Sequence, residues 1–158
     1  MPSRPIERIV ADSLWNGAVA TAATTAVASL CGEIETRSVA APLNAVSHIV
    51  WGDDAARHSE LSARYTVPGL LLNGAAVTSW AILQELLFDR QQVKKSLTQS
   101  IAEGAVISGL AYVTDYHIVP PRLTPGFEKR LSNRSLTAVY ATLAASLGAA
   151  SWWRRRSG

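Results

Sequence analysis

The sequence predicts an all-α fold: a polytopic membrane helix bundle, one domain over residues 1–158, with about four spanning helices and one short interfacial or re-entrant helix. Charged residues make up 17% of the chain, whereas soluble domains average roughly 25%. Three long stretches contain no charged residue at all, namely residues 13–32, 65–84 and 135–153. Each is long enough to cross a hydrocarbon core about 30 Å thick, which needs about 20 helical residues.

The rest of the composition excludes several classes of protein. An apolar content of 48% is too high for a disordered chain, and the single cysteine, Cys31, excludes an internal disulfide or a cysteine-based zinc site. Mean hydropathy is only +0.12, so this average does not separate a soluble from a membrane protein. The distribution of charge along the chain is more informative. A soluble helix carries a charged residue on its outer face every three or four residues, and the three stretches contain none. A soluble bundle is the alternative, because the first and last stretches are rich in Ala, Thr and Ser.

The first span is expected at residues 9–31, with Trp15 near one membrane interface. It is too long for the apolar core of a cleaved signal peptide, and acidic as well as basic residues flank it, so we expect a retained helix. Ala18, Ala22 and Ala26 recur at four-residue spacing. Such a face lets another helix backbone approach closely, although plain Ala helix propensity explains the spacing equally well.

Residues 33–64 carry charges at both ends and are expected to reach water there. Between the charges we predict a short helix over about 40–51, with Pro42 suited to its first turn and Trp51 followed by Gly52 at its end. This helix is too short to span the membrane. We expect it to lie in the interface or to dip into the bundle.

Three further spans are expected at about 67–88, 96–118 and 135–153. The span at 96–118 is interrupted by Glu103 and Asp115, and two prolines follow it. The last span ends in two tryptophans and three arginines. That pattern is typical of an interfacial anchor, because the rings lie at headgroup level and the guanidinium groups bind phosphates.

With four spans, both termini lie on the same side of the membrane. The terminal side then carries eight of the 15 cations, which are Arg4, Arg8, Arg90, Lys94, Lys95, Arg154, Arg155 and Arg156. The opposite side carries seven, which are Arg37, Arg57, Arg64, Arg122, Lys129, Arg130 and Arg134. This difference is too small to set the orientation by itself. The acids of the first loop disfavour a cytoplasmic position for it, so we expect a multi-pass protein with cytoplasmic termini.

A resemblance to a known group of proteins is carried by three segments: AAPLNAVSHIVWGDDA (40–55), AYVTDYHIVPPRLTPGFEKRLS (111–132) and the SLTAVYATLAASLG stretch that follows. The most specific parts are N-A-V-S-H-x-x-W-G-D and R-L-T-P-G-F-E. Over roughly residues 15–150 the chain resembles small, functionally uncharacterised proteobacterial inner-membrane proteins. The resemblance implies a bacterial inner (cytoplasmic) membrane location and a four-helix layout, but no activity, ligand or catalytic residue.

The candidate functional site is a set of polar residues in or beside the expected spans. A charge at the centre of a spanning helix costs about 2.5–3.5 kcal/mol, so each one calls for a reason. The set comprises Glu85, Glu103, Asp115, Tyr112, His48 and Asn44. One hypothesis makes the carboxylates a proton or cation site, aided by His48 and Asn44. The structural alternative leaves Glu85 and Glu103 solvated at the interface, with Asp115 bonded to a hydroxyl or paired with Arg122.

No cofactor or metal is expected. His48 and Asn44, one helical turn apart, suit a polar pocket shared with Asn73 and Gln84, but no His-x-x-His or Glu-x-x-His spacing builds a metal site. A bis-histidine haem would have to use His48 and His117. The familiar motifs of soluble enzymes do not occur. The basic residues adjoin apolar stretches without interleaved aromatics, which indicates lipid contact rather than nucleic acid.

Three functions are compatible with this pattern. The first is a non-enzymatic bundle in the lipid bilayer that acts by self-association as a homo-oligomer, or by joining a larger membrane complex. The second is a small proton or cation transporter, or a channel-like protein, that uses Glu103 and Asp115. The third is a haem- or metal-binding redox subunit that uses His48 and His117. The short loops and the missing catalytic constellation favour the first.

Overall fold

The computed structural model of the chain describes residues 5–88 and 95–157. Throughout these residues the regular secondary structure is helical, with no strand, which confirms the all-α prediction. The long helices are α1 (Ile6–Thr36), α4 (Thr66–Phe88), α5 (Leu97–Val113) and α6 (Asn133–Ser157). By length and composition, α1 and α4 are each capable of crossing a membrane, with mean hydropathies of 1.3 and 1.4 over their most apolar windows.

The long helices begin and end close to the predicted positions, with two differences. α1 extends beyond 9–31 at both ends and stops where Arg37 takes a left-handed conformation (φ 57°). The Arg37 backbone N–H there donates to the Glu33 carbonyl at 3.1 Å, which satisfies one of the last orphan carbonyls of the helix. The predicted helix at 96–118 changes its winding in its last turn, where η2 (Thr114–Ile118) is a π-helix. Single π turns inside α-helices often occur at functional sites.

The short helix predicted at 40–51 is two helices, α2 (Ala41–Val46) and α3 (His48–Trp51). They meet at Ser47, whose hydroxyl donates to the Asn44 carbonyl at 2.7 Å. Such a side-chain bond competes with the regular helical ladder and favours a break. Every residue of α2 is buried, so this segment packs inside the protein.

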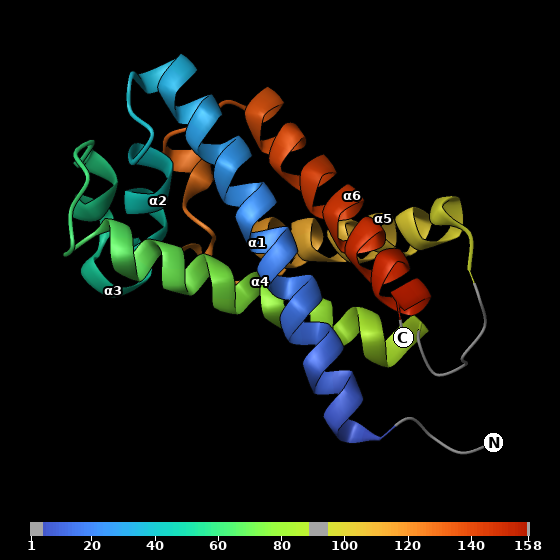
Figure 1. Ribbon diagram of the computed structural model, residues 1–158. Coiled ribbons are helices and arrows are strands. Elements are labelled where there is room, and N and C mark those ends of the chain that lie inside the picture. Colours follow the sequence, from blue (N-terminus) through green and yellow to red (C-terminus); the bar gives the residue numbers. More distant parts are fainter. Residues whose placement is uncertain (1–4, 89–94, 158) are drawn as a thin grey trace.

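The long helices form two layers (Figure 1). α1 and α6 run in opposite directions side by side in the front layer, and α4 and α5 cross behind them. The N-terminus of α1 and the C-termini of α4 and α6 gather at one end of the molecule, near the start of α5. Three of the cations in the orientation argument, Arg4, Arg90 and Lys94, lie outside the described residues.

The opposite end is covered by two connecting segments, residues 37–65 and 119–132, which we call the cap. Besides α2 and α3, the cap contains the short 3-10 helices η1 (Asp53–Arg57), η3 (Pro121–Leu123) and η4 (Phe127–Lys129). Segments far apart in the sequence therefore lie side by side at this end of the bundle (Figure 1).

Two apolar clusters fill the interior. The central cluster joins all the long helices and consists of Ala20, Val77, Ala81, Ile107, Ala111, Leu143 and Leu147. The second cluster lies between the bundle and the cap and consists of Ala28, Val46, Phe127, Leu131, Leu136 and Val139. Small residues bring the backbones together: a Cβ added at Gly104 of α5 would lie 2.2 Å from the Ala144 carbonyl oxygen of α6.

Gly104→Ala should therefore separate α5 from α6 and destabilise the fold by about 1–3 kcal/mol, the usual cost of overpacking. Gly109→Ala is the matched control on the same helix, because nothing lies within 4 Å of its added Cβ. The control should be neutral or stabilising by about 0.5–1 kcal/mol, since Ala favours helix more than Gly. Thermal unfolding of the purified variants measures both, and equal effects would contradict the close packing of α5 on α6.

Candidate functional site

Asn44 holds the first cap segment together. Its side chain is completely buried, and its Nδ2 donates to the backbone carbonyls of His58 at 3.1 Å and Glu60 at 2.8 Å. Its Oδ1 accepts a hydrogen bond from the Thr66 hydroxyl at 2.6 Å, at the start of α4. The amide is thus committed to the cap rather than to the pocket with Asn73 and Gln84 that the sequence suggested.

His48 joins the two cap segments. The imidazole is buried, with Nδ1 2.9 Å from the Ala45 carbonyl oxygen and Nε2 3.4 Å from that of Pro121. Gly126 makes this approach possible, because it has φ +87° and an added Cβ would lie 2.8 Å from His48 Nδ1. Both ring nitrogens face backbone carbonyls, which suits a structural linker and leaves no lone pair directed at a metal. Among the described residues, no group of three or more His, Cys, Asp or Glu side chains is placed to hold a metal ion.

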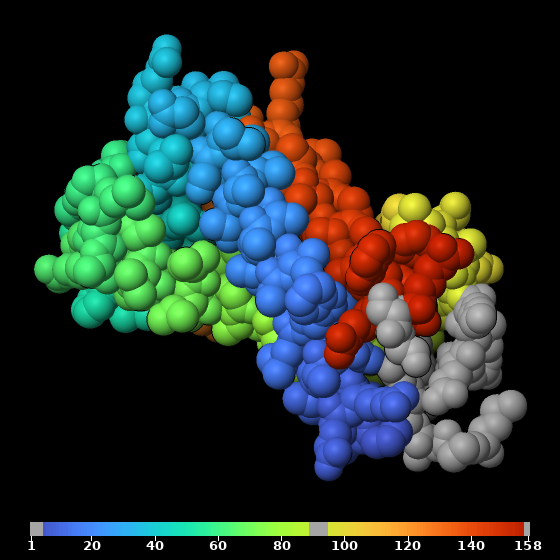
Figure 2. All heavy atoms as spheres, in the orientation of Figure 1, coloured from blue at the N-terminus to red at the C-terminus, as the bar shows by residue number. Residues whose placement is uncertain are grey.

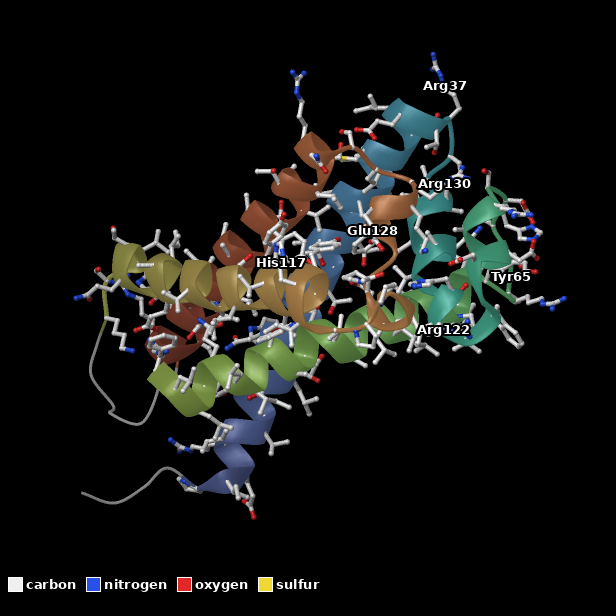
Figure 3. The ribbon with its side chains drawn as sticks, turned by 180° about the vertical axis from the view of Figure 1, so that it is seen from behind. Arg37, Tyr65, His117, Arg122, Glu128 and Arg130 are labelled. Carbon is white, nitrogen blue, oxygen red and sulfur yellow. The ribbon has the colours of Figure 1, made fainter. Side chains whose placement is uncertain are left out.

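Basic side chains of the second cap segment bind the first (Figure 3). Arg130 donates to the Ala56 carbonyl at 2.9 Å and to the Ser59 hydroxyl at 2.7 Å. Lys129 pairs with Asp53 at 2.9 Å. These polar contacts hold 119–132 against 37–65 and help to align the helices that the two segments connect.

Asp115 lies in the π-helical turn η2 and accepts a hydrogen bond from the Tyr140 hydroxyl of α6 at 2.5 Å. This contact agrees with the structural role considered for Asp115 above, in which the acid is bonded to a hydroxyl. The other partner considered, Arg122, instead donates through Nε to the Ile49 carbonyl at 3.1 Å. Tyr112 packs edge-on against the Tyr140 ring, with ring centroids 5.4 Å apart. The acid therefore lies at the edge of an aromatic cluster between α5 and α6.

A cavity of about 230 Å³ opens beside Asp115. Its walls are mainly apolar and come from the long helices and the cap, with Leu72, Val139 and Leu143 among them. Few polar side chains line it; they are Asp115, Tyr140, Asn73 and Thr24.

Glu85 lies at the other end of the bundle. It is only 3% exposed and accepts a hydrogen bond from Asn16 Nδ2 at 2.8 Å. The Ser151 hydroxyl lies 3.5 Å from the same carboxylate oxygen. Glu85 therefore links α4 to α1 and α6, inside the protein.

Glu103 belongs to the same end as Glu85. It is bonded to the Lys95 ammonium and lies 3.5 Å from the Arg155 guanidinium. Nearby, Arg154 pairs with Asp12 at 2.7 Å, joining the two termini of the bundle. These paired charges are typical of helix ends that are held together electrostatically.

The predicted site residues fall into three separate places. Asn44 and His48 lie in the cap, Asp115 and Tyr112 lie beside the cavity, and Glu85 and Glu103 lie at the terminal end. On α5, Ile107 and Ala111 of the central apolar cluster stand between Glu103 and Asp115. The structure therefore does not bring the two acids into one site.

Tyr140 is the functional candidate that sequence reasoning missed. It lies on the same helical face as Leu136, Leu143 and Leu147, and this spacing of three or four residues marks it as inward-facing. Gln84 is a second surprise, because it is completely buried and neither of its polar atoms has a hydrogen-bond partner among the described residues. A buried amide of this kind calls for an ordered water.

Comparison of the chain with protein-family models, with curated proteins and with solved structures finds no match.

The Asp53–Lys129 pair makes cap docking sensitive to acid. The Lys129 ammonium donates a hydrogen bond to the Asp53 carboxylate and attracts it, which lowers the pKa of Asp53 below its ordinary value. A carboxyl group with a lowered pKa in the folded state stabilises the fold above its unfolded pKa, and this contribution is lost as the pH falls through the folded pKa. Lys129→Met should raise the pKa of Asp53 toward the ordinary value and reduce that contribution, because Lys129 is the largest of its causes.

An NMR titration of the Asp53 carboxyl carbon measures this shift. Arg134→Met is the control, because Arg134 is an exposed cation at the start of α6 and makes no contribution to the Asp53 environment. An unchanged Asp53 pKa in Lys129→Met would refute the ion pair.

Proposed function

We propose that the chain is a multi-pass integral membrane protein whose four long helices all span the bilayer, and that it acts by association rather than catalysis. The observation that supports this most directly is the inverted polarity of its helices. α4 turns Asn73, Gln84 and Glu85 inward, while Leu71 and Leu87 are 68% and 52% exposed. A helix of a water-soluble protein has the opposite arrangement.

α1 and α5 show the same arrangement, with polar or small side chains buried and large apolar side chains exposed. α1 buries Ser13, Asn16 and Thr24, whereas Leu14 and Leu30 are 57% and 62% exposed. α5 buries Ser100, Gly104 and Ser108 and exposes Ile101, Val106, Leu110 and Val113. Only 28% and 22% of the most apolar windows of α1 and α4 are buried, whereas the core helix of a soluble protein is mostly buried. Lipid chains are as apolar as these side chains, so lipid suits the exposed faces.

The distribution of polar groups along the bundle supports four spans. Ion pairs gather at the terminal end, and the hydrogen-bonded cap covers the other end, while the middle is apolar. At the end of α6, the Arg156 guanidinium lies 4.5 Å from the centre of the Trp152 ring, and Trp153 is 62% exposed. Aromatic and cationic side chains in this combination suit a membrane interface. We place the termini in the cytoplasm and the acid-bearing cap outside it, in a bacterial inner membrane.

The proposed association surface is the outer face of the front layer, which Figure 2 shows. It exposes small side chains at four-residue spacing along two neighbouring antiparallel helices: Ala18, Ala22 and Ala26 on α1, and Ala141, Ala145 and Ala149 on α6. In lipid, faces of small residues allow backbones to approach closely and gain packing energy. The occupant that we propose is a second copy of the chain, because a two-fold axis through this face would pair identical alanine surfaces.

The geometry gives less support to the other two functions. A transport path using Glu103 and Asp115 would have to cross the central apolar cluster. A haem at His48 would have to displace the backbone carbonyls that both ring nitrogens face. Association requires no such rearrangement.

The four-span topology can be tested with single cysteines in a Cys31→Ser background. Ala63→Cys in the cap and Thr98→Cys at the start of α5 are both at exposed positions. A membrane-impermeant maleimide added to spheroplasts should label Ala63→Cys and should label Thr98→Cys only after lysis. Equal labelling of both before lysis, or recovery of the protein without detergent in the high-speed supernatant, would rule out the proposed topology.

The association surface can be tested by adding bulk to it. Ala145→Trp should weaken self-association by about tenfold, which corresponds to about 1.4 kcal/mol, because a large ring separates the two backbones. Val106→Trp on α5 is the control, since Val106 is 52% exposed on a face assigned to lipid. Single-molecule photobleaching in native-membrane vesicles measures the dimer fraction. A monomeric wild-type protein, or equal losses in both variants, would refute the surface.

A further inference from the structure

The cavity beside Asp115 combines an apolar body with one acidic group. Its volume is about 230 Å³, and its apolar walls include Leu72, Val77 and Phe127. The Asp115 carboxylate accepts one hydrogen bond, from Tyr140, and the cavity borders the same acid. Ligand sites in proteins are commonly built in this way, with apolar walls and a few polar groups that fix orientation.

The charge of this acid is not balanced by the described part of the chain. Within residues 5–88 and 95–157, Asp115 forms no ion pair with Lys, Arg or His, and Arg122 is bound to a backbone carbonyl instead. The charge that acts on Asp115 there is a second acid, Glu128, which accepts a hydrogen bond from the Thr124 hydroxyl at 2.6 Å and lies outside the cavity lining. Two neighbouring acids without a counter-ion favour the uptake of a positive group.

The other walls indicate an organic cation rather than a metal ion. Hard metal cations require six or more oxygen ligands, whereas this cavity offers few polar side chains and mainly apolar ones. Its lining also includes the aromatic side chains of Trp80 and Tyr140, and aromatic faces attract organic ammonium groups.

The volume limits the size of the ligand. A cavity of about 150 Å³ holds a benzene molecule. The larger volume here therefore has room for one six-membered ring and a short arm that carries the ammonium group.

We propose that this cavity binds a small organic ammonium ion, with the ammonium on Asp115 and a ring-sized apolar body against Trp80 and Leu72. The cavity reaches the outside of the protein at two exposed lining residues, Ala76 on α4 and Leu123 in the cap, the latter 51% exposed. A ligand would enter from the side of the bundle, next to the cap. This site does not depend on self-association, which uses the outer faces of α1 and α6, whereas the cavity opens beside α4 and the cap.

The test uses the full chain in lipid nanodiscs and two probes of the same shape. The probes are 2-phenylethylammonium and its neutral isostere propylbenzene, and binding is measured by calorimetry and by quenching of Trp80 fluorescence, with Trp80→Phe as the blank. The wild-type protein should bind the ammonium saturably and more tightly than the hydrocarbon. Asp115→Asn should weaken binding of the ammonium by about tenfold or more, the loss expected for one charge-assisted hydrogen bond, and should leave propylbenzene unaffected.

A second pair of variants keeps the test decisive if Asp115→Asn folds poorly. Ala76→Trp fills the mouth and should abolish binding of both probes, whereas Ala75→Trp, at the neighbouring exposed position outside the cavity lining, should leave binding intact. Equal affinities for the two probes, an unchanged ammonium affinity in Asp115→Asn, or full binding in Ala76→Trp would each overturn the proposal. The dimer fraction measured in the same samples shows separately whether the association surface is correct.

Discussion

The structure depends on one constraint: α1, α4 and α5 turn most of their small and polar side chains toward neighbouring helices and most of their large apolar side chains outward. Asn16 and Glu85 are buried between α1 and α4, while Leu14 and Leu86 are among the exposed side chains of the same helices. In water this arrangement would sacrifice the hydrophobic effect that normally drives helices together. In lipid it is favourable, because helix association there is driven by close packing and by interhelical hydrogen bonds.

This constraint explains how the polar groups are distributed. Buried charges are costly unless they are paired or hydrogen-bonded, and the acids at the terminal end are paired across helices, as Asp12 is with Arg154 and Glu103 is with Arg155. At the other end, the buried polar side chains of the cap are also hydrogen-bonded. The polar atoms of Asn44 and His48 contact backbone carbonyls and a hydroxyl. Asp115 accepts its hydrogen bond from a neutral hydroxyl and also borders a cavity, and this combination makes the cavity a candidate ligand site.

Much of the fold could be predicted from the sequence, because helix length and missing charge are local properties. The helix predicted at 67–88 agrees with α4 to within one residue, and the helix predicted at 135–153 agrees with α6 to within four residues. The break at Ser47 was not predicted, since it depends on one side-chain bond within an otherwise helical pattern. The geometry of the site is harder to predict from the sequence. The sequence marks Asp115 as a candidate with a hydroxyl as one possible partner, but it does not identify Tyr140, because that residue lies 25 positions away and only tertiary packing brings the two together. The same holds for His48 and Pro121, which are 73 residues apart.

The most direct test of the account is whether lipid surrounds the outer face of α4. Nitroxide labels at Leu71→Cys and Leu86→Cys, in a Cys31→Ser background reconstituted into liposomes, report collisions with oxygen, which concentrates in lipid, and with a water-soluble nickel chelate. If lipid covers this face, oxygen accessibility should be high and nickel accessibility low at both positions, with the reverse at the cap position Ala63→Cys. Nickel accessibility at Leu71 and Leu86 as high as at Ala63 would show that water, not lipid, covers this face.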